Sequence, residues 1–361
     1  MGSQIDNNTL LALGSLTQRG LWNGAEIISQ VLGSGNPAQN RIINALCLIS
    51  QRGDFSAASA ALNNTYYIDR FSVGWSNVSA NKQHISTNQP SALFGSKSLR
   101  LTATSAHASG YLLINQSVEN PLDLVGKEIT LSAWVKSSNP NARLRAYWTE
   151  GGATFRSTKH TGDGTWQRLT LTFTINSTVG TTGHLNVMAI TYSDSETGVS
   201  IAIGDYIEAT GWMLNVGPMA MPVCLAGVTQ EGELALCQRY FERVDSSYMA
   251  QEICAIDGPS RRYIDFSVPF KTTKRVLGTV TGSSPTLVSS YSPTAGQIAI
   301  YQTGAEGLFT ISNTWTFSYS PMLNKLHVRM IGSANNSISG TALVGQLALG
   351  SGVGFSVDAE I

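Results

Sequence analysis

Charged residues are scarce in this chain of 361 residues, since Asp, Glu, Lys and Arg make up only 13% of it. The 23 basic and 23 acidic residues also cancel, so the formal net charge at pH 7 is zero. Binding to the phosphates of a nucleic acid needs a basic surplus, and the composition therefore argues against a nucleic-acid partner. With 42% hydrophobic residues, the chain is also too apolar for an intrinsically disordered protein.

Cysteine is rare too: there are four, and no two have the C-x-x-C spacing of a zinc site. So few cysteines in so long a chain do not make a disulfide framework, and we expect Cys47, Cys224, Cys237 and Cys254 to be reduced and mostly buried. Neither a run of about 20 apolar residues nor a signal peptide is present, so no membrane insertion is expected. No Asp-rich loop identifies a calcium site, and no metal or cofactor is predicted.

The chain is rich instead in 35 Gly and in alternating apolar positions, which together predict β-strands joined by tight turns. Three strands are especially clear, and their apolar sets are Ile129, Leu131, Ala133 and Val135; Leu144, Ala146 and Trp148; and Leu169, Leu171, Phe173 and Ile175. Strict alternation means that one face of each strand is buried. We therefore predict a mainly β protein, with an antiparallel β-sandwich over residues 65–222. The order of its strands resembles a jelly roll of the carbohydrate-binding-module type.

The parts on either side differ from this pattern. Residues 1–64 are the least sheet-like, with a short helix expected from Asn8 to Leu16. Residues 223–361 are predicted to form a linker helix, near residues 229–244, and a C-terminal β-sandwich domain. The helix either packs on its own domain or lies at a three-fold axis, and the sequence leaves both open. Only Glu306, Lys325 and Arg329 carry charge between residues 276 and 357, which favours surface buried between subunits or covered by hydroxyl and amide groups.

Three separate segments carry a resemblance to a known group of proteins. They are NRIINALCLISQRG with its continuation to YIDRF (Asn40–Phe71), ELALCQRYFE (Glu233–Glu242) and the end SVDAEI (Ser356–Ile361). In content and order they resemble bacteriophage fibre proteins, with mild departures at Ala45, Leu46, Phe71 and Ile361. The resemblance implies a virion protein of tail or capsid, made in the cytoplasm of a bacterial host. It also implies a homotrimer that adheres to a host surface glycan or protein. For residues 1–64 it favours a connector to other virion proteins, while the sequence leaves open that they are a packing arm.

An enzymatic role is not expected. Cleavage of a glycan needs two carboxylates placed across the sugar bond, and no acidic pair stands out on one predicted strand. The chain has no G-x-S-x-G or H-E-x-x-H motif and no repeat that would indicate a β-helix depolymerase. A capsid-attached head fibre or decoration protein is the first alternative to an adhesive fibre, and a glycan-degrading fibre enzyme is the second.

A glycan-binding face is the favoured kind of site. On the strands named above, the side chains out of phase with the apolar sets include two aromatic–cation groups. The candidate residues are Trp134, Arg143, Arg145, Tyr147, Trp166 and Arg168. If these strands are neighbours, one sheet face carries aromatic rings, which stack on sugars, among arginines, which pair with acidic groups. The alternative is that Trp134 packs under a loop or another subunit and that the arginines are a solvated face.

Overall fold

The computed structural model of the chain describes residues 40–93, 95–176 and 183–244, and further segments at 255–256, 263–282, 286–288, 297–302, 310–311, 315–332, 338–339, 345–349 and 355–360. The helix expected from Asn8 to Leu16 lies outside these residues. The chain divides into two units, residues 1–233 and 234–361, and each is described by itself. Within the described residues, no helix is both long enough and apolar enough to cross a bilayer.

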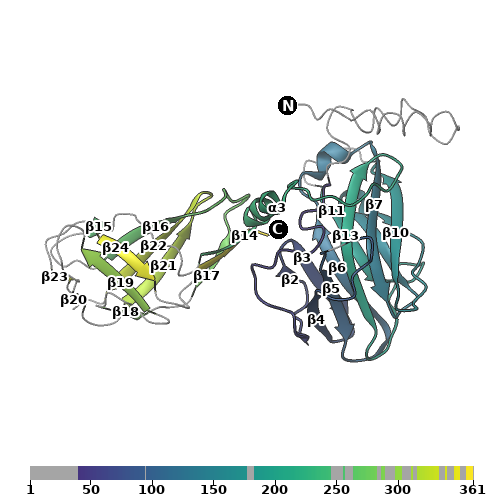
Figure 1. The fold of residues 1–361 in the computed structure, drawn as a ribbon, viewed down its shortest axis with the longest axis horizontal. Helices are drawn as coiled ribbons and strands as arrows, with labels where there is room; N and C mark the ends of the chain where they lie inside the picture. The colour runs from purple at the N-terminus through teal and green to yellow at the C-terminus, as the bar shows by residue number, and fades with distance from the viewer. Residues whose placement is uncertain are drawn as a thin grey trace. The chain divides into compact units, whose positions relative to one another are not determined.

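The first unit is a jelly-roll sandwich of two antiparallel sheets (Figure 1), which confirms the predicted mainly β class. The six-stranded sheet has the order β1-β4-β5-β13-β7-β10. Its strands are β1 (Ser59–Ala60), β4 (Ala80–Ile85), β5 (Ser98–Ala103), β7 (Glu128–Ser137), β10 (Trp166–Thr174) and β13 (Tyr206–Val216). Strand β13 pairs on both sides, with β5 and β7, and so lies at the centre of this sheet.

The opposite, seven-stranded sheet has the order β2-β3-β6-β11-β8-β9, with β12 paired to β6. Its strands are β2 (Thr65–Ile68), β3 (Phe71–Ser76), β6 (His107–Ser117), β8 (Ala142–Trp148), β9 (Ala153–Arg156), β11 (Leu185–Thr191) and β12 (Val199–Ile201). Two short 3-10 helices, η1 (Pro121–Leu124) and η2 (Glu150–Gly152), lie between strands. Strands β7 and β8 follow each other in the sequence but belong to different sheets.

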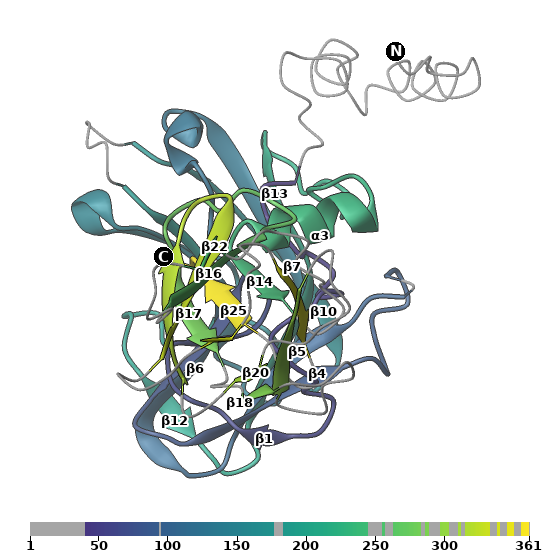
Figure 2. The ribbon, with the colours of Figure 1, turned by 90° about the vertical axis from the view of Figure 1, so that its left-hand side faces the viewer.

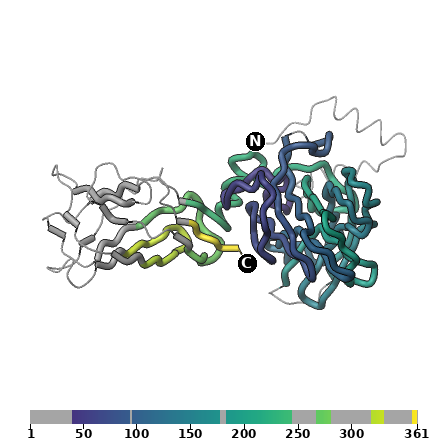
Figure 3. The backbone as a smooth tube through the Cα atoms, turned by 90° about the horizontal axis from the view of Figure 1, so that it is seen from below, coloured from purple at the N-terminus to yellow at the C-terminus, as the bar shows by residue number. Residues whose placement is uncertain are grey.

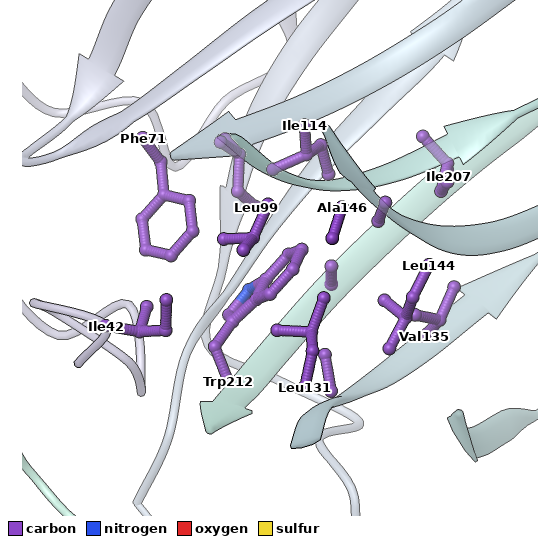
Figure 4. Packing of buried hydrophobic residues seen from close by; sticks show 14 of the residues in the cluster. Ile42, Phe71, Leu99, Ile114, Leu131, Val135, Leu144, Ala146, Ile207 and Trp212 are labelled. Carbon is purple, nitrogen blue, oxygen red and sulfur yellow. The ribbon is translucent and has the colours of Figure 1, made fainter. Parts of the chain in front are cut away.

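The core lies between the sheets and contains the apolar positions that the alternation predicted. Leu131 and Val135 from β7 and Leu144 from β8 are fully buried, and they meet across the sandwich (Figure 4). Trp212 is also fully buried, with its ring centroid 5.5 Å from that of Phe71. Burying each large apolar side chain contributes roughly 1.5–3 kcal/mol, so this double layer is the main source of stability of the unit.

Residues 40–49 close one part of this core, with Ile42, Ala45 and Cys47 all fully buried. The side chain of Asn40 holds the segment in place by donating to the carbonyl oxygens of Trp212 at 2.7 Å and Cys224 at 2.9 Å. The side-chain carbonyl oxygen of Asn40 accepts hydrogen bonds from the backbone N–H groups of Ile42 at 3.0 Å and Leu214 at 3.1 Å. The predicted N-terminal segment, residues 1–64, thus includes residues that pack into the sandwich.

Asn44 is the second anchor of this segment. It has a left-handed backbone, with φ of 61°, which asparagine tolerates better than most residues. Its amide group bonds the backbone of Ile49 and Asp69, and its backbone N–H donates to the buried carboxylate of Glu233. The same carboxylate accepts from the N–H of Gly227 at 2.6 Å. Two of the three sequence segments that resemble phage fibres are therefore bonded to each other within the first unit.

The helix predicted near residues 229–244 is shorter than expected. Helix α3 (Gln230–Gln238) ends before Tyr240, and the chain continues as strand β14 (Phe241–Val244). Tyr240 and Phe241 are buried and β14 pairs with the last strand, β25 (Phe355–Asp358), so tertiary pairing overrides the helical spacing. The boundary between the two units falls within α3.

The described part of the second unit contains four small sheets. Strand β25 lies between β14 and β17 (Thr279–Gly282; Figure 2). A four-stranded sheet has the order β15 (Ala255–Ile256), β16 (Tyr263–Pro269), β22 (Lys325–Gly332) and β21 (Trp315–Pro321). The other two contain β18 (Thr286–Val288), β19 (Gln297–Gln302) and β24 (Gly345–Leu349), and β20 (Thr310–Ile311) with β23 (Ile338–Ser339). Strands were predicted at β16, β19, β21, β22 and β25, and all five are confirmed.

The start of the second unit is tied to the end of the chain. The backbone carbonyl of Tyr240 accepts a hydrogen bond of 2.6 Å from the backbone N–H of Ala359. This bond extends the pairing of β14 with β25, near the end of the chain marked C in Figure 3. On β14, Glu242 is buried and forms an ion pair of 2.5 Å with Lys274, whose side chain is fully buried. Lys274 also donates to the carbonyl of Gln238 at the end of α3. The second and third resembling segments are thus joined within this unit.

Candidate ligand-binding face

The six predicted site residues lie on two different sheets. Trp134 on β7 and Trp166 and Arg168 on β10 belong to the six-stranded sheet, whereas Arg143, Arg145 and Tyr147 on β8 belong to the seven-stranded sheet. Trp134, Arg143, Arg145, Tyr147 and Arg168 each adjoin core residues of their strand, and Trp166 is in phase with Arg168, so all six lie on outer faces, as alternation predicted. The expectation that the three strands are neighbours is wrong for β8. The chain crosses from one sheet to the other in the turn at residues 138–141.

Loops of the same chain contact part of the outer face of the six-stranded sheet, at Trp166 and Arg168. Arg168 stands opposite Trp134 in the β7–β10 register, so these two residues are neighbours. The guanidinium of Arg168 donates to the carbonyl of Met221 and to the hydroxyl of Ser132 at 3.2 Å. The indole N–H of Trp166 donates to the carbonyl of Asn88 at 2.7 Å. These contacts tie the segments around Asn88 and Met221 to β10. They also engage the Trp166 indole N–H and the Arg168 guanidinium, which a ligand on this face would need.

Leu93, in the connection between β4 and β5, also reaches this face beside Trp134. Both residues abut Gly211, where an added Cβ would lie 2.3 Å from Cδ1 of Leu93 and 3.0 Å from Cδ1 of Trp134. Gly211 has φ of 61° and sits where the register between β13 and β7 shifts. The alternative interpretation, in which Trp134 packs under a loop, fits this arrangement.

The seven-stranded sheet carries a different outer face around β8. In its register, Tyr147 stands opposite Asn186 of β11, which in turn stands opposite Ser117 of β6. The next row is Arg145, Met188 and Asn115. We call these six side chains the β8 face: Tyr147, Asn186, Ser117, Arg145, Met188 and Asn115. All except Met188 are partly exposed, so the face presents a ring, a guanidinium, two amides and a hydroxyl.

Aromatic rings surround Arg145 on this face. Its guanidinium carbon lies 5.0 Å from the ring centre of Tyr147 and 5.7 Å from that of Tyr192. Tyr192 in turn makes an edge-to-face contact with Tyr111 of β6, at 5.1 Å between ring centres. Burial raises the pKa of the Tyr192 hydroxyl. Arg145 also donates to the sulfur of Met188 at 3.5 Å, so the guanidinium is held between these two rings and the neighbouring strand.

Four cations gather at the edge of the β8 face. We call them the cationic cluster: Arg143, Arg145, Arg156 and Lys159. Two carboxylates from the loop at residues 192–198, between β11 and β12, are paired with them. Glu196 binds Arg145 at 2.8 Å and Arg156 at 2.5 Å. Asp194 binds Arg143 at 2.7 Å and Lys159 at 2.9 Å.

These contacts change the acid strength of Asp194. Hydrogen bonds first from Lys159 and then from Arg143 lower the pKa of its carboxyl group to about 2. Asp194 is therefore ionised throughout the physiological range. With four cations and two carboxylates, the cluster keeps a local surplus of two positive charges, although the chain as a whole has none.

Several residues of this region were not predicted from the sequence. Asn186, Tyr192, Asp194, Glu196 and Arg156 reach β8 only through the pairing of β11, the following loop and β9. The only local feature that could have indicated them is the pair of acids among hydroxyl residues at 193–197. That pattern is typical of an ordinary polar turn. Among the described residues, no group of three or more His, Cys, Asp or Glu side chains has the arrangement of a metal site.

Comparison with known proteins adds little beyond the fold. No protein-family model matches the chain, and no curated protein sequence does. The chain is similar to TmCBM61 in complex with beta-1,4-galactotriose, at 16% identity and a TM-score of 0.30, over 49% of this chain and 99% of that one.

Two further solved structures are similar. One is the enzymatically active domain of tailspike protein 4 of bacteriophage CBA120, at 14% identity and a TM-score of 0.30, over 50% of this chain and 22% of that one. The other is a family 11 carbohydrate-binding module of a cellulosomal cellulase of Clostridium thermocellum, at 11% identity and a TM-score of 0.28, over 46% of this chain and 99% of that one. Likeness at this level says nothing about what this chain binds.

Proposed function

We propose that this protein is a non-enzymatic bacteriophage fibre protein that binds a glycan of the host surface through the β8 face. The observation that carries the proposal is the row Tyr147, Asn186 and Ser117 beside Arg145 on an outer sheet face. An aromatic ring can stack on the C–H face of a sugar while amides, hydroxyls and a guanidinium bond its oxygens. This combination matches a sugar better than an apolar ligand.

The virion context rests on the three sequence segments that resemble phage fibres. Their residues are bonded to one another within each unit, through Asn44 and Glu233 in the first and through Tyr240 and Ala359 in the second. Although these segments lie far apart in the sequence, the fold brings them into contact with one another. The proposal includes a homotrimer attached to other virion proteins by the N-terminal segment. A capsid-attached head fibre or decoration protein would use the same segments.

The state of the acids near the β8 face favours binding over catalysis. Glycan hydrolysis needs one protonated and one ionised carboxyl group, with the acid's pKa raised. Asp194 has its pKa lowered to about 2, and both Asp194 and Glu196 are held in ion pairs. Burial raises the pKa of Glu233, but that carboxylate is 1% exposed and bonded to backbone N–H groups. None of the three is placed to serve as a general acid.

The test uses Tyr147→Ala and an array of bacterial surface glycans. We expect the wild-type protein to bind at least one glycan and Tyr147→Ala to bind it about tenfold or more weakly, because a stacked ring contributes roughly 1–3 kcal/mol. Thr170→Ala, on the exposed outer face of β10, is the matched control and should bind normally.

Melting temperatures of the three proteins separate binding from folding. A variant that melts normally and binds weakly supports the β8 face. If the wild-type protein binds no glycan, or if Tyr147→Ala binds as the wild type does, the proposed function is wrong. Release of reducing ends or unsaturated sugars from the bound glycan would overturn its non-enzymatic part.

A further inference from the structure

We infer that the β8 face selects acidic glycans, and that Glu196 holds the place of the ligand's acidic group on Arg145 and Arg156 until the ligand displaces it. The inference rests on the proposed function and names its ligand class. It follows from the charge balance, the geometry of Glu196 and the exposure of the paired groups.

The charge balance at the site is unlike that of the chain. Charged residues make up 13% of the sequence and sum to zero, yet four cations meet only two carboxylates beside the β8 face. An uncompensated pair of positive charges attracts an anion even before any ion pair opens. A neutral sugar would gain nothing from this surplus, whereas a carboxylated or phosphorylated one would.

Glu196 already shows how such a group would be bound. One carboxylate oxygen lies 2.8 Å from Nε of Arg145 and the other 2.5 Å from Nε of Arg156, so the carboxylate bridges two guanidinium groups. Its backbone has φ of 58°, which is costly for a residue other than glycine. The backbone N–H of Thr197 donates to the hydroxyl of Ser193 at 3.0 Å, and the two hydroxyl groups lie 2.7 Å apart, so these contacts hold the loop in this conformation.

The exposure of the side chains distinguishes Glu196, which a ligand can displace, from Arg143, which stays in place. Glu196 is 22% exposed and Arg156 34%, so both side chains lie at the surface. The Glu196 oxygen that faces Arg156 is buried, and within the described residues it has no hydrogen-bond partner, so a ligand must move the Glu196 side chain to reach Arg156 there. Arg143 is only 3% exposed, and within the described residues its Nε has no hydrogen-bond partner. Arg143 therefore stays as a fixed charge beneath Asp194 while Glu196 leaves. Lys159, 36% exposed, adds a further positive charge for a polymer with repeated acidic groups.

The decisive experiment compares acidic and neutral forms of glycans on the same array. It includes carboxylated, phosphorylated and neutral bacterial polysaccharides, and the pair polygalacturonate and its methyl ester as a matched change of charge. We expect acidic forms to bind and neutral forms to bind at least about tenfold more weakly, since charge-assisted hydrogen bonds are roughly twice as strong as neutral ones. The carboxylated and phosphorylated arms identify which acidic group is preferred.

Three variants test the role of Glu196. Glu196→Gln removes the competing charge at nearly constant shape, and we expect it to bind the acidic glycan several-fold more tightly. Arg145→Gln should weaken acidic binding about tenfold, the loss expected for one charge-assisted contact. Asp54→Asn, an exposed acid beside β4 at the other edge of the sandwich, alters net charge equally and should leave binding unchanged.

The outcomes separate this inference from the proposed function. Binding of neutral glycans only overturns the acidic preference and leaves the proposed function standing, whereas no glycan binding overturns both. If Glu196→Gln melts lower and binds more weakly, Glu196 is a structural counter-charge and the displacement is wrong. If Arg145→Gln binds acidic glycans as the wild type does, the acidic group is bound elsewhere.

Discussion

Asn44 and Glu233 are separated by 189 positions in the sequence, yet the backbone of one bonds the carboxylate of the other. The carboxylate of Glu233 has almost no contact with solvent, and it accepts hydrogen bonds from the backbone N–H groups of Asn44 and Gly227. Burial raises the pKa of this carboxyl group, while its hydrogen bonds to the backbone of Gly227 and Asn44 act in the opposite direction. Protonation of Glu233 is therefore linked to folding of the first unit.

The pH dependence that follows can be measured. Because the folded-state pKa of Glu233 is raised, the folded protein keeps a proton that the unfolded chain has lost. Glu233 thus lowers the free energy of unfolding as pH rises from its ordinary value of 4.5 through the raised pKa. Below 4.5 both states are protonated and the effect vanishes. Urea unfolding at a series of pH values should show this decline in the wild type relative to Glu233→Gln, which does not titrate. Parallel pH curves for the two proteins would contradict the linkage.

The outer position of Tyr147 and Arg145 could be predicted from the sequence, because alternation is a local property of a strand. Their partners could not. Glu196 is 51 positions from Arg145, and no short-range pattern links a polar turn to a distant strand. The sequence also gives no sign that Trp166 and Arg168 bond the protein's own loops. Their polar groups look equally available to solvent, to a ligand or to a loop carbonyl.

Among elements, the strands were easier to predict than the sheets they join. Both β7 and β8 show clear alternation, but the turn at 138–141 fits either a hairpin within one sheet or a crossing between two. That choice decides whether Trp134 and Tyr147 share a face, and it depends on long-range pairing of β13 and β11. The end of α3 was missed for the same reason, since β14 gains its partner from the last residues of the chain.

The segment between β16 and β17 offers a test at this scale. Lys274 reaches from it to Glu242 on β14, and both side chains are almost fully buried, at 0% and 1% exposure. Removing one partner of a buried ion pair leaves an uncompensated charge and costs roughly 3–5 kcal/mol. We expect Lys274→Met to destabilise the second unit by about that amount in calorimetric melts.

The double variant Lys274→Met with Glu242→Gln is the matched control. Removing both charges should recover most of the lost stability, because no charge is then left buried without a partner. If the single and double variants lose the same amount of stability, the lysine acts through packing against Phe270 and not through the ion pair. The ring centre of Phe270 lies 4.4 Å from the ammonium nitrogen of Lys274.

At the scale of the whole molecule, the low charge of residues 276–357 is the feature with the clearest consequence. Among the described positions of that stretch, Lys325 is partly buried and Arg329 is exposed, whereas Glu306 lies outside the described residues. A surface with so little charge is poorly suited to an isolated domain and fits one covered by identical subunits. Light scattering at micromolar concentration should give three times the mass of one chain. A monomer under those conditions would contradict the fibre assembly, although not the glycan-binding proposal.

The bonds of Asn40 also bear on how the protein is made. Synthesis proceeds from the N-terminus, so Asn40 leaves the ribosome 172 residues before Trp212 and 184 before Cys224, whose carbonyl oxygens its amide binds. At the usual elongation rates of about 5–20 residues per second, Ile42 and Cys47 wait on the order of ten seconds or longer before they can be covered. Such distant pairing slows folding and leaves apolar side chains open to misassembly between nascent chains. Truncated forms that end before β13 should therefore aggregate rather than fold, because the sandwich can be completed only after β13 has been synthesised.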